Sequence, residues 1–261
     1  MQINGVHLNV QRTGKSQPVI LLHGLMSNLT ALQPEIERLS RSFEVIAIDS
    51  RGHGRSEKPA HFTLQDHIDD VLGVMDALNL PSVFLVGTSA GSYIAQGVAS
   101  QQPERIRKLV LIVPKSNGKT SSVARFIAEH EEEVRGLGHD EIQALVLSHI
   151  FAPSTPESIR AEQAEWSRQQ AEQGLTLDAQ QAEAASQALA GFDFRPVLPQ
   201  ITAETLVISG RHDILNLVAE GQLIAELIPK ARLEVLEQSG HLPNVEEPER
   251  LLELVEAFLK A

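Results

Sequence analysis

The sequence predicts an α/β fold in which a mostly parallel sheet carries helices on both faces. Short apolar runs rich in Val, Ile and Leu alternate along the chain with longer stretches of helical periodicity. Strands that are buried on both faces read as continuous apolar runs, and their alternation with helices is typical of βαβ units. We therefore expect one doubly covered parallel sheet as the framework of the molecule.

The predicted elements follow one another in a regular order. Residues Ile3–Val10 are expected to form an edge hairpin, because Asn4-Gly5 is a turn sequence and the residues after it alternate. Buried strands are expected at Val19–Leu22, Val45–Ile48, Ser82–Val86, Leu109–Val113, Thr205–Ile208 and Leu233–Leu236. Covering helices are expected at Leu29–Ser40, Thr63–Leu78, Ala90–Ser100, Leu215–Leu227 and Pro248–Leu259.

The alternation is interrupted once, between Lys115 and Pro196. This segment is rich in Glu, Gln and Ala and shows no convincing strand pattern. Helices are expected within it at Val123–Val134, Asp140–Ile150, Pro156–Gly174 and Leu177–Leu189. The insertion either adds bulk alone or forms a lid over the carboxyl ends of the strands, where ligands of open α/β sheets bind.

The overall composition excludes several classes of function. The 261 residues include 22 Lys plus Arg and 34 Asp plus Glu, a formal net charge of −12, which disfavours nucleic acid and anionic membranes as partners. The chain has no cysteine, so disulfides, thiolate catalysis and zinc–thiolate sites are excluded. No leader pattern occurs, and no apolar run approaches the roughly 20 residues that span a bilayer. A cytoplasmic location is the resulting expectation.

The pentapeptide Gly87-Thr88-Ser89-Ala90-Gly91 is the strongest candidate for chemistry. It follows an apolar strand and opens a helix pattern, which is the context that a G-x-S-x-G nucleophile elbow requires. A strand that turns directly into a helix holds the serine in a strained conformation, so its neighbours must be small. As an isolated match the motif would often be structural, but its place between strand and helix favours Ser89 as a nucleophile.

A nucleophilic serine needs a base and an acid that orients the base, and both follow in the chain order associated with such an elbow. Asp213 lies on a loop after the strand Thr205–Ile208, and His241 lies on the loop after the last strand. We therefore predict the catalytic triad Ser89, Asp213 and His241. Asp49 also ends a strand and competes for the role of the acid, whereas His212 is expected to be a loop residue.

The sequence Leu21-Leu22-His23-Gly24-Leu25 follows an early strand and is the candidate for an oxyanion hole. Gly24 lets the main chain approach a substrate, so the N–H of Leu25 and that of Ala90 are expected to bind the oxyanion. Removing one such donor typically costs about 3 to 4 kcal/mol of transition-state stabilisation. His23 itself is expected to brace the loop through hydrogen bonds.

These motifs together resemble the α/β-hydrolase superfamily. The resemblance is carried by His23-Gly24, by Asp49-Ser50-Arg51-Gly52-His53-Gly54-Arg55-Ser56, by the elbow and by Ser239-Gly240-His241. It covers essentially the whole chain and implies an α/β-hydrolase fold with core residues 1–114 and 197–261. Residues 115–196 would be a helical cap inserted after the sixth strand. The resemblance also implies that Asp49 belongs to a scaffold loop.

Within the superfamily, Ala190-Gly191-Phe192-Asp193-Phe194 and Leu198-Pro199-Gln200-Ile201 resemble the cap exit of 3-oxoadipate enol-lactonase-like hydrolases. One departure is Ser92, where that group usually has a second glycine after the elbow. Ser89 itself argues against similar haloalkane dehalogenases and epoxide hydrolases, which carry Asp at this point.

The expected activity is hydrolysis of a small carboxylic ester or lactone through an acyl-enzyme. The same triad would also serve carbon–carbon bond hydrolysis, acyl transfer, or slow turnover in a ligand-sensing protein. No cofactor is implied, and the ten histidines show no helical pair that suggests a metal site. Five of the ten aromatic residues fall in the insertion, and Trp166 is the one predicted to line the acyl pocket. Oligomeric state is left open.

Overall fold

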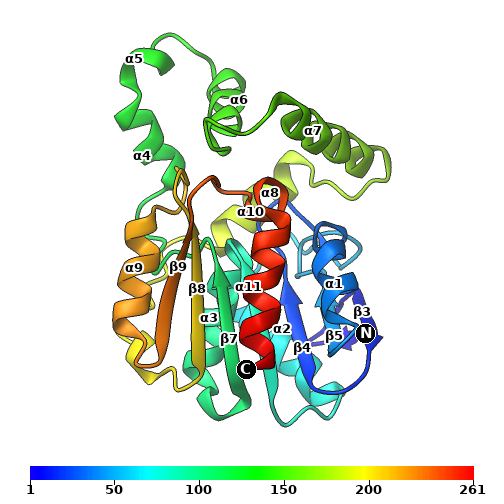
Figure 1. Ribbon diagram of the computed structural model, residues 1–261. Coiled ribbons are helices and arrows are strands. Elements are labelled where there is room, and N and C mark those ends of the chain that lie inside the picture. The colour runs from blue at the N-terminus through cyan, green and yellow to red at the C-terminus, as the bar shows by residue number, and fades with distance from the viewer.

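The computed structural model describes the backbone of all 261 residues, together with every side chain except those of His139, Asp140 and Gln143. Its framework is a seven-stranded sheet with the order β3-β5-β4-β6-β7-β8-β9 (Figure 1). The strands are β3 (Val10–Gly14), β4 (Pro18–Leu22), β5 (Glu44–Ile48), β6 (Val83–Thr88), β7 (Ile106–Ile112), β8 (Glu204–Gly210) and β9 (Ala231–Leu236). Every pair is parallel except β3 with β5, so the mostly parallel sheet is confirmed.

Five helices cover the two faces of this sheet. They are α1 (Gln33–Leu39), α2 (Leu64–Ala77), α3 (Ala90–Gln101), α9 (Val218–Leu227) and α11 (Pro248–Lys260). Apolar side chains of α1 and α11 pack into one core with one side of the strands, and those of α2, α3 and α9 pack into a second core on the other side. Each central strand is buried on both faces, which explains why its sequence reads as an unbroken apolar run.

The N-terminal segment differs from the single hairpin expected. Strands β1 (Gln2–Ile3) and β2 (Val6–His7) form a separate two-stranded sheet around the Asn4-Gly5 turn, in which both residues have positive φ. Leu8 is fully buried and Asn9 bonds to Asp49, so the chain leaves the hairpin before β3 joins the large sheet. The insertion therefore follows the seventh strand of the chain, not the sixth.

The insertion between β7 and β8 is helical. It contains α4 (Ser122–Glu129), α5 (Glu131–Val134), α6 (His139–His149), α7 (Glu157–Glu172) and α8 (Ala179–Ala188). Figure 1 shows these helices beyond one end of the sheet, the end at which β7 finishes. Asn117 bridges Asp193 where the insertion leaves and rejoins the core, whereas the exact boundaries 114/115 and 196/197 stay a prediction.

No helix in the described part of the chain is long and apolar enough to cross a bilayer. A short helix, α10 (Pro243–Glu246), and three 3₁₀ turns complete the fold; the turns span Leu29–Leu32, Pro103–Arg105 and Leu198–Gln200.

Candidate active site

Ser89 occupies a strained turn between β6 and α3. Its backbone has φ 50° and ψ −116°, a conformation that residues other than glycine rarely adopt. A Cβ atom on Gly87 would overlap the carbonyl of Gly91, and one on Gly91 would overlap the carbonyl of Leu22. The glycines are therefore required by close packing of strand against helix, and the turn presents Ser89 at the carboxyl end of the sheet.

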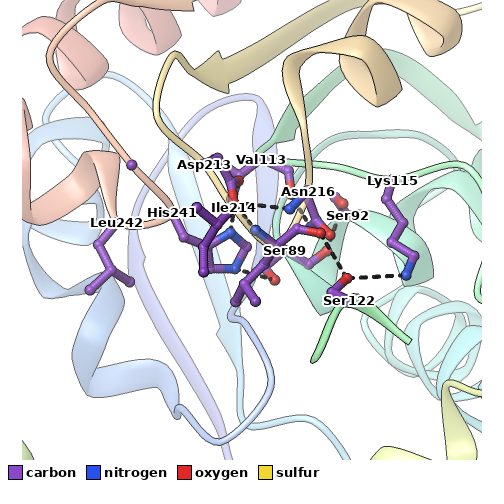
Figure 2. A network of polar contacts seen from close by, with 12 residues as sticks. Ser89, Ser92, Val113, Lys115, Ser122, Asp213, Ile214, Asn216, His241 and Leu242 are labelled. Carbon is purple, nitrogen blue, oxygen red and sulfur yellow. Dashed lines mark hydrogen bonds and ion pairs between the residues drawn. The ribbon is translucent and has the colours of Figure 1, made fainter. Parts of the chain in front are cut away.

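The structure brings Ser89, His241 and Asp213 together in one hydrogen-bonded chain (Figure 2). Ser89 Oγ lies 3.0 Å from His241 Nε2, and His241 Nδ1 lies 2.8 Å from Asp213 Oδ2. The other carboxylate oxygen, Oδ1, accepts the N–H groups of Leu215 at 2.8 Å and Asn216 at 2.9 Å. The Asp213 side chain is fully buried, so these bonds fix a carboxylate beside the imidazole.

This network sets the tautomer of His241. A carboxylate only accepts hydrogen bonds, so Nδ1 carries the proton that it donates to Asp213. Nε2 is then the acceptor for the Ser89 hydroxyl, as the base in a Ser-His-Asp triad must be. The backbone N–H of His241 donates to the carbonyl of Ile150 at 2.6 Å, which attaches the histidine loop to the cap.

Two buried residues that the sequence did not indicate, Asn216 and Tyr93, support the site. Asn216 Nδ2 donates to the carbonyl of Val113 at 2.6 Å and to Tyr93 Oη at 2.8 Å. Tyr93 lies one helical turn after Ser89 on α3, and burial raises the pKa of its phenol. The pair fixes the Asp213 loop between the end of β7 and the elbow helix. Tyr93 follows Ser89 at the spacing of one helical turn, the one local signal by which it could have been found.

The two backbone groups predicted for the oxyanion hole lie beside Ser89. A Cβ atom on Gly24 would lie 3.4 Å from Ser89 Cβ, so the loop that carries Leu25 passes close to the nucleophile. Ala90 is the first residue of α3, where amides lack partners within the helix. Within the described chain neither N–H donates a hydrogen bond, so both are free to bind a ligand.

His23 and Asp49 hold the neighbouring loops. His23 Nε2 accepts the N–H of Ser50 at 3.1 Å, so its Nδ1–H is left to donate to the carbonyl of Gly24 at 2.7 Å. His23 thus braces its loop, as expected. Asp49 accepts the N–H of Leu29 at 2.7 Å and that of Arg55 at 2.9 Å, which engages both carboxylate oxygens away from His241. Asp213, not Asp49, is the carboxylate that meets the imidazole.

Ser92 and His212 have simple local explanations. The Ser92 hydroxyl is fully buried and donates to the carbonyl of Ser89 at 2.6 Å, so the departure from glycine leaves the turn intact. His212 is exposed on its loop, where its N–H donates to the carbonyl of Ser239.

Trp166 lies half-buried on α7 of the cap. Gln170, one helical turn later, is buried and accepts hydrogen bonds from Asn28 Nδ2 and Thr30 Oγ1, both at 3.0 Å. Residues four positions apart share a helix face, so Trp166 lies on the face that meets the loop after β4. That loop also carries Leu25. The contact of Trp166 with a substrate stays a prediction.

The known proteins that this chain resembles are hydrolases of one fold. A family model described as "alpha/beta hydrolase fold" matches residues 17–248. The chain is 32% identical to 3-oxoadipate enol-lactonase 2 of Acinetobacter baylyi, over 98% of this chain and 94% of that protein. It is 31% identical to 2-hydroxymuconate semialdehyde hydrolase of a Pseudomonas species, over 98% and 91%. The solved enol-lactonase of Burkholderia xenovorans superimposes with a TM-score of 0.84 at 25% identity, covering 100% of this chain and 99% of that one.

Proposed function

This chain belongs to the α/β-hydrolase family and is a hydrolase, and we propose that it cleaves a small carboxylic ester or lactone through the triad Ser89, His241 and Asp213. The sequence-based expectation of the family, including its enol-lactonase-like members, is confirmed. The observation that carries the proposal is the unbroken hydrogen-bonded chain from Asp213 through His241 to Ser89.

In the first half of the reaction, Ser89 Oγ attacks the carbonyl carbon of the substrate. His241 Nε2 takes the hydroxyl proton, and Asp213 stabilises the imidazolium that forms. The negative charge that develops on the carbonyl oxygen is met by the N–H groups of Leu25 and Ala90. The tetrahedral species collapses when His241 returns the proton to the leaving oxygen, which leaves an acyl-Ser89 ester.

In the second half, water replaces the leaving group. His241 Nε2 removes a proton from the water as it attacks the acyl carbon, and then protonates Ser89 Oγ when the acyl bond breaks. For a lactone the leaving oxygen stays on the same molecule, so the product is one hydroxy or oxo acid. No external oxidant, reductant or group carrier is needed to balance these steps.

A second candidate is hydrolysis of a carbon–carbon bond beside a ketone. The relative that acts on 2-hydroxymuconate semialdehyde and a solved meta-cleavage product hydrolase of Pseudomonas fluorescens, with a TM-score of 0.79 at 26% identity, favour it. Lactonases and this class match at comparable identities, so both reactions are assayed below. The ester or lactone is preferred because the enol-lactonases match at 32% identity and with a TM-score of 0.84, above the values for the carbon–carbon hydrolases.

The site is tested with a fluorophosphonate probe and the variant Ser89→Ala. The wild-type protein should be labelled once, at Ser89, and Ser89→Ala should lose both labelling and hydrolysis of p-nitrophenyl esters, by roughly 10⁴-fold or more in kcat. Ser167→Ala, which removes an exposed hydroxyl on the cap, is the matched control and should behave as wild type. Labelling that persists in Ser89→Ala would exclude this nucleophile.

The substrate class is tested on the wild-type protein with three panels. These are p-nitrophenyl esters of graded length, lactones of graded ring size, and 2-hydroxymuconate semialdehyde. The highest kcat/KM is expected on an ester or a lactone. A preference of 10-fold or more for the semialdehyde would assign the carbon–carbon reaction instead, and one slow covalent cycle without turnover would contradict both.

A further inference from the structure

Three side chains that commonly bind metals meet at the far end of the cap. His130 follows α4, Glu133 lies in α5, and His149 ends α6. One nitrogen of each histidine and one oxygen of the carboxylate all lie within 4.8 Å of one another. All three are accessible, since both histidines are half-buried and Glu133 is exposed. Three separate helices thus converge on one point with two imidazoles and a carboxylate.

Hydrogen bonds within the helices fix which nitrogen of each histidine faces that point. His130 Nδ1 lies 2.9 Å from the carbonyl of Phe126, and His149 Nδ1 lies 2.9 Å from the carbonyl of Leu145. A carbonyl only accepts, so each Nδ1 carries the proton and each Nε2 keeps its lone pair. A backbone carbonyl on the second nitrogen is the arrangement that orients metal-binding histidines in proteins. His130 is also stacked on Phe126, with ring centroids 4.0 Å apart.

A direct hydrogen bond does not account for the arrangement. Glu133 Oε2 and His149 Nε2 are 3.8 Å apart, beyond hydrogen-bond distance. The carboxylate and the two Nε2 lone pairs are the groups that a shared cation would bind. The carboxylate belongs to the run Glu131-Glu132-Glu133, which makes the surrounding potential negative.

We propose that His130, Glu133 and His149 bind a divalent cation of the zinc type, with water in the fourth position. Zinc takes nitrogen ligands at about 2.0 to 2.1 Å and carboxylate oxygen at about 2.0 to 2.2 Å in a tetrahedron, which separates neighbouring ligand atoms by roughly 3.3 Å. Binding therefore requires the three side chains to close by at most about 1.5 Å, a movement within the reach of rotamer adjustment. Mg²⁺ prefers an octahedron of oxygen ligands, so this donor set selects against it.

The site is connected to the proposed active site through one residue. Ile150, directly after His149, supplies the carbonyl that accepts the backbone N–H of His241 at 2.6 Å. A cation on His149 fixes the end of α6 and so holds this acceptor in place. This consequence, unlike the binding itself, rests on the proposed function: zinc is expected to change the rate of ester hydrolysis while the protein remains folded.

The binding test uses the full chain without a histidine tag, titrated with ZnCl₂ and with MgCl₂ and followed by calorimetry and thermal denaturation. One equivalent of Zn²⁺ should bind and raise Tm, and Mg²⁺ should do neither. His130→Gln, Glu133→Gln and His149→Gln should each weaken Zn²⁺ binding by at least ~10-fold. Glu132→Gln and His61→Gln, which alter exposed residues of the same types, are the matched controls and should bind as wild type.

Anomalous scattering at the zinc edge locates the ion in crystals of the unaltered protein and needs no variant to fold. A peak between His130, Glu133 and His149 supports the proposal. A peak only at His241, or binding that the three variants leave unchanged, overturns it. Absence of saturable binding overturns it as well. None of these outcomes depends on the substrate, so failure here would leave the proposed hydrolase activity standing.

Discussion

The elbow helix α3 and the cap helices differ in how many of their residues are buried. In α3 every residue from Ala90 to Ser100 is buried, whereas Phe126 is the buried residue of α4 and Gln170 that of α7. Tight packing holds a strained serine and its partners in one arrangement, because neighbours that cannot move over-determine the geometry. The cap helix α8 buries three alanines, and the cap helices together bury a smaller share of their residues than α3 does. The packed region is therefore suited to hold the proposed triad, and substitutions in the cap are expected to change substrate preference at little cost in stability.

The largest expected effect separates two buried aspartates of the packed region. Asp213→Asn should lower kcat by about 10⁴-fold, because an amide opposite His241 Nδ1 favours the wrong imidazole tautomer. Asp49→Asn should leave kcat within about 10-fold and instead lower the free energy of unfolding by about 1 to 3 kcal/mol, since an amide donor then faces N–H donors. Steady-state kinetics and urea denaturation measure the two quantities. If the two variants exchange these effects, the acid is Asp49.

The second prediction contrasts buried histidines of the core with an exposed one. Burial, reinforced by neighbouring histidines, lowers the pKa of His53 to about 4 and that of His67 to about 3. The unfolded chain binds these protons near pH 6.5, so stability is fully present above that pH and is lost as the pH falls toward 4. The loss by pH 4.5 is up to about 3 kcal/mol for each histidine, at 1.4 kcal/mol per pH unit.

His67→Gln tests that contrast through the slope of Tm against pH between 7.5 and 4.5. The variant should lose less stability than the wild type over this interval, although its Tm at pH 7.5 is lower. His61→Gln, which removes an exposed histidine, should keep the wild-type slope. An unchanged slope in His67→Gln would mean that the acid sensitivity of the fold has another source.

The smallest expected effect concerns Trp166 in the cap. If it lines the acyl pocket, Trp166→Ala should shift the ratio of kcat/KM between long and short esters by roughly 10-fold toward the longer chain. Labelling of Ser89 by the fluorophosphonate should stay the same, and Ser167→Ala should keep the wild-type ratio. A wild-type chain-length profile in Trp166→Ala would place the pocket wall on other residues.

Much of the fold was accessible from the sequence because its determinants are local. Each central strand is a continuous apolar run, and Ser89, Asp213 and His241 each follow such a run in a Gly-containing segment. Parallel strands bring their carboxyl ends to one edge, so strand order alone places these residues near one another. Their observed geometry agrees with that expectation, and their catalytic roles stay a proposal.

The features that the sequence did not indicate depend on contacts between distant segments. His130 and Glu133 are three positions apart, but His149 lies on another helix and meets them through tertiary packing. Tyr93 and Asn216 meet across 123 positions of chain. The early end of the first hairpin depends on the burial of Leu8 against the core. Such contacts are set by tertiary packing, which a pattern along the chain does not encode.

The positive φ of Ser89 belongs to the backbone and not to the hydroxyl. The close approach of Gly87 to the carbonyl of Gly91, and of Gly91 to the carbonyl of Leu22, holds strand and helix together on either side of this turn. An unbranched reactive side chain at this position meets the same backbone strain as Ser89, whereas a β-branched one is disfavoured. The turn and the sheet beneath it do not depend on the hydroxyl of Ser89. A different unbranched reactive side chain could therefore occupy the turn without a change in the sheet.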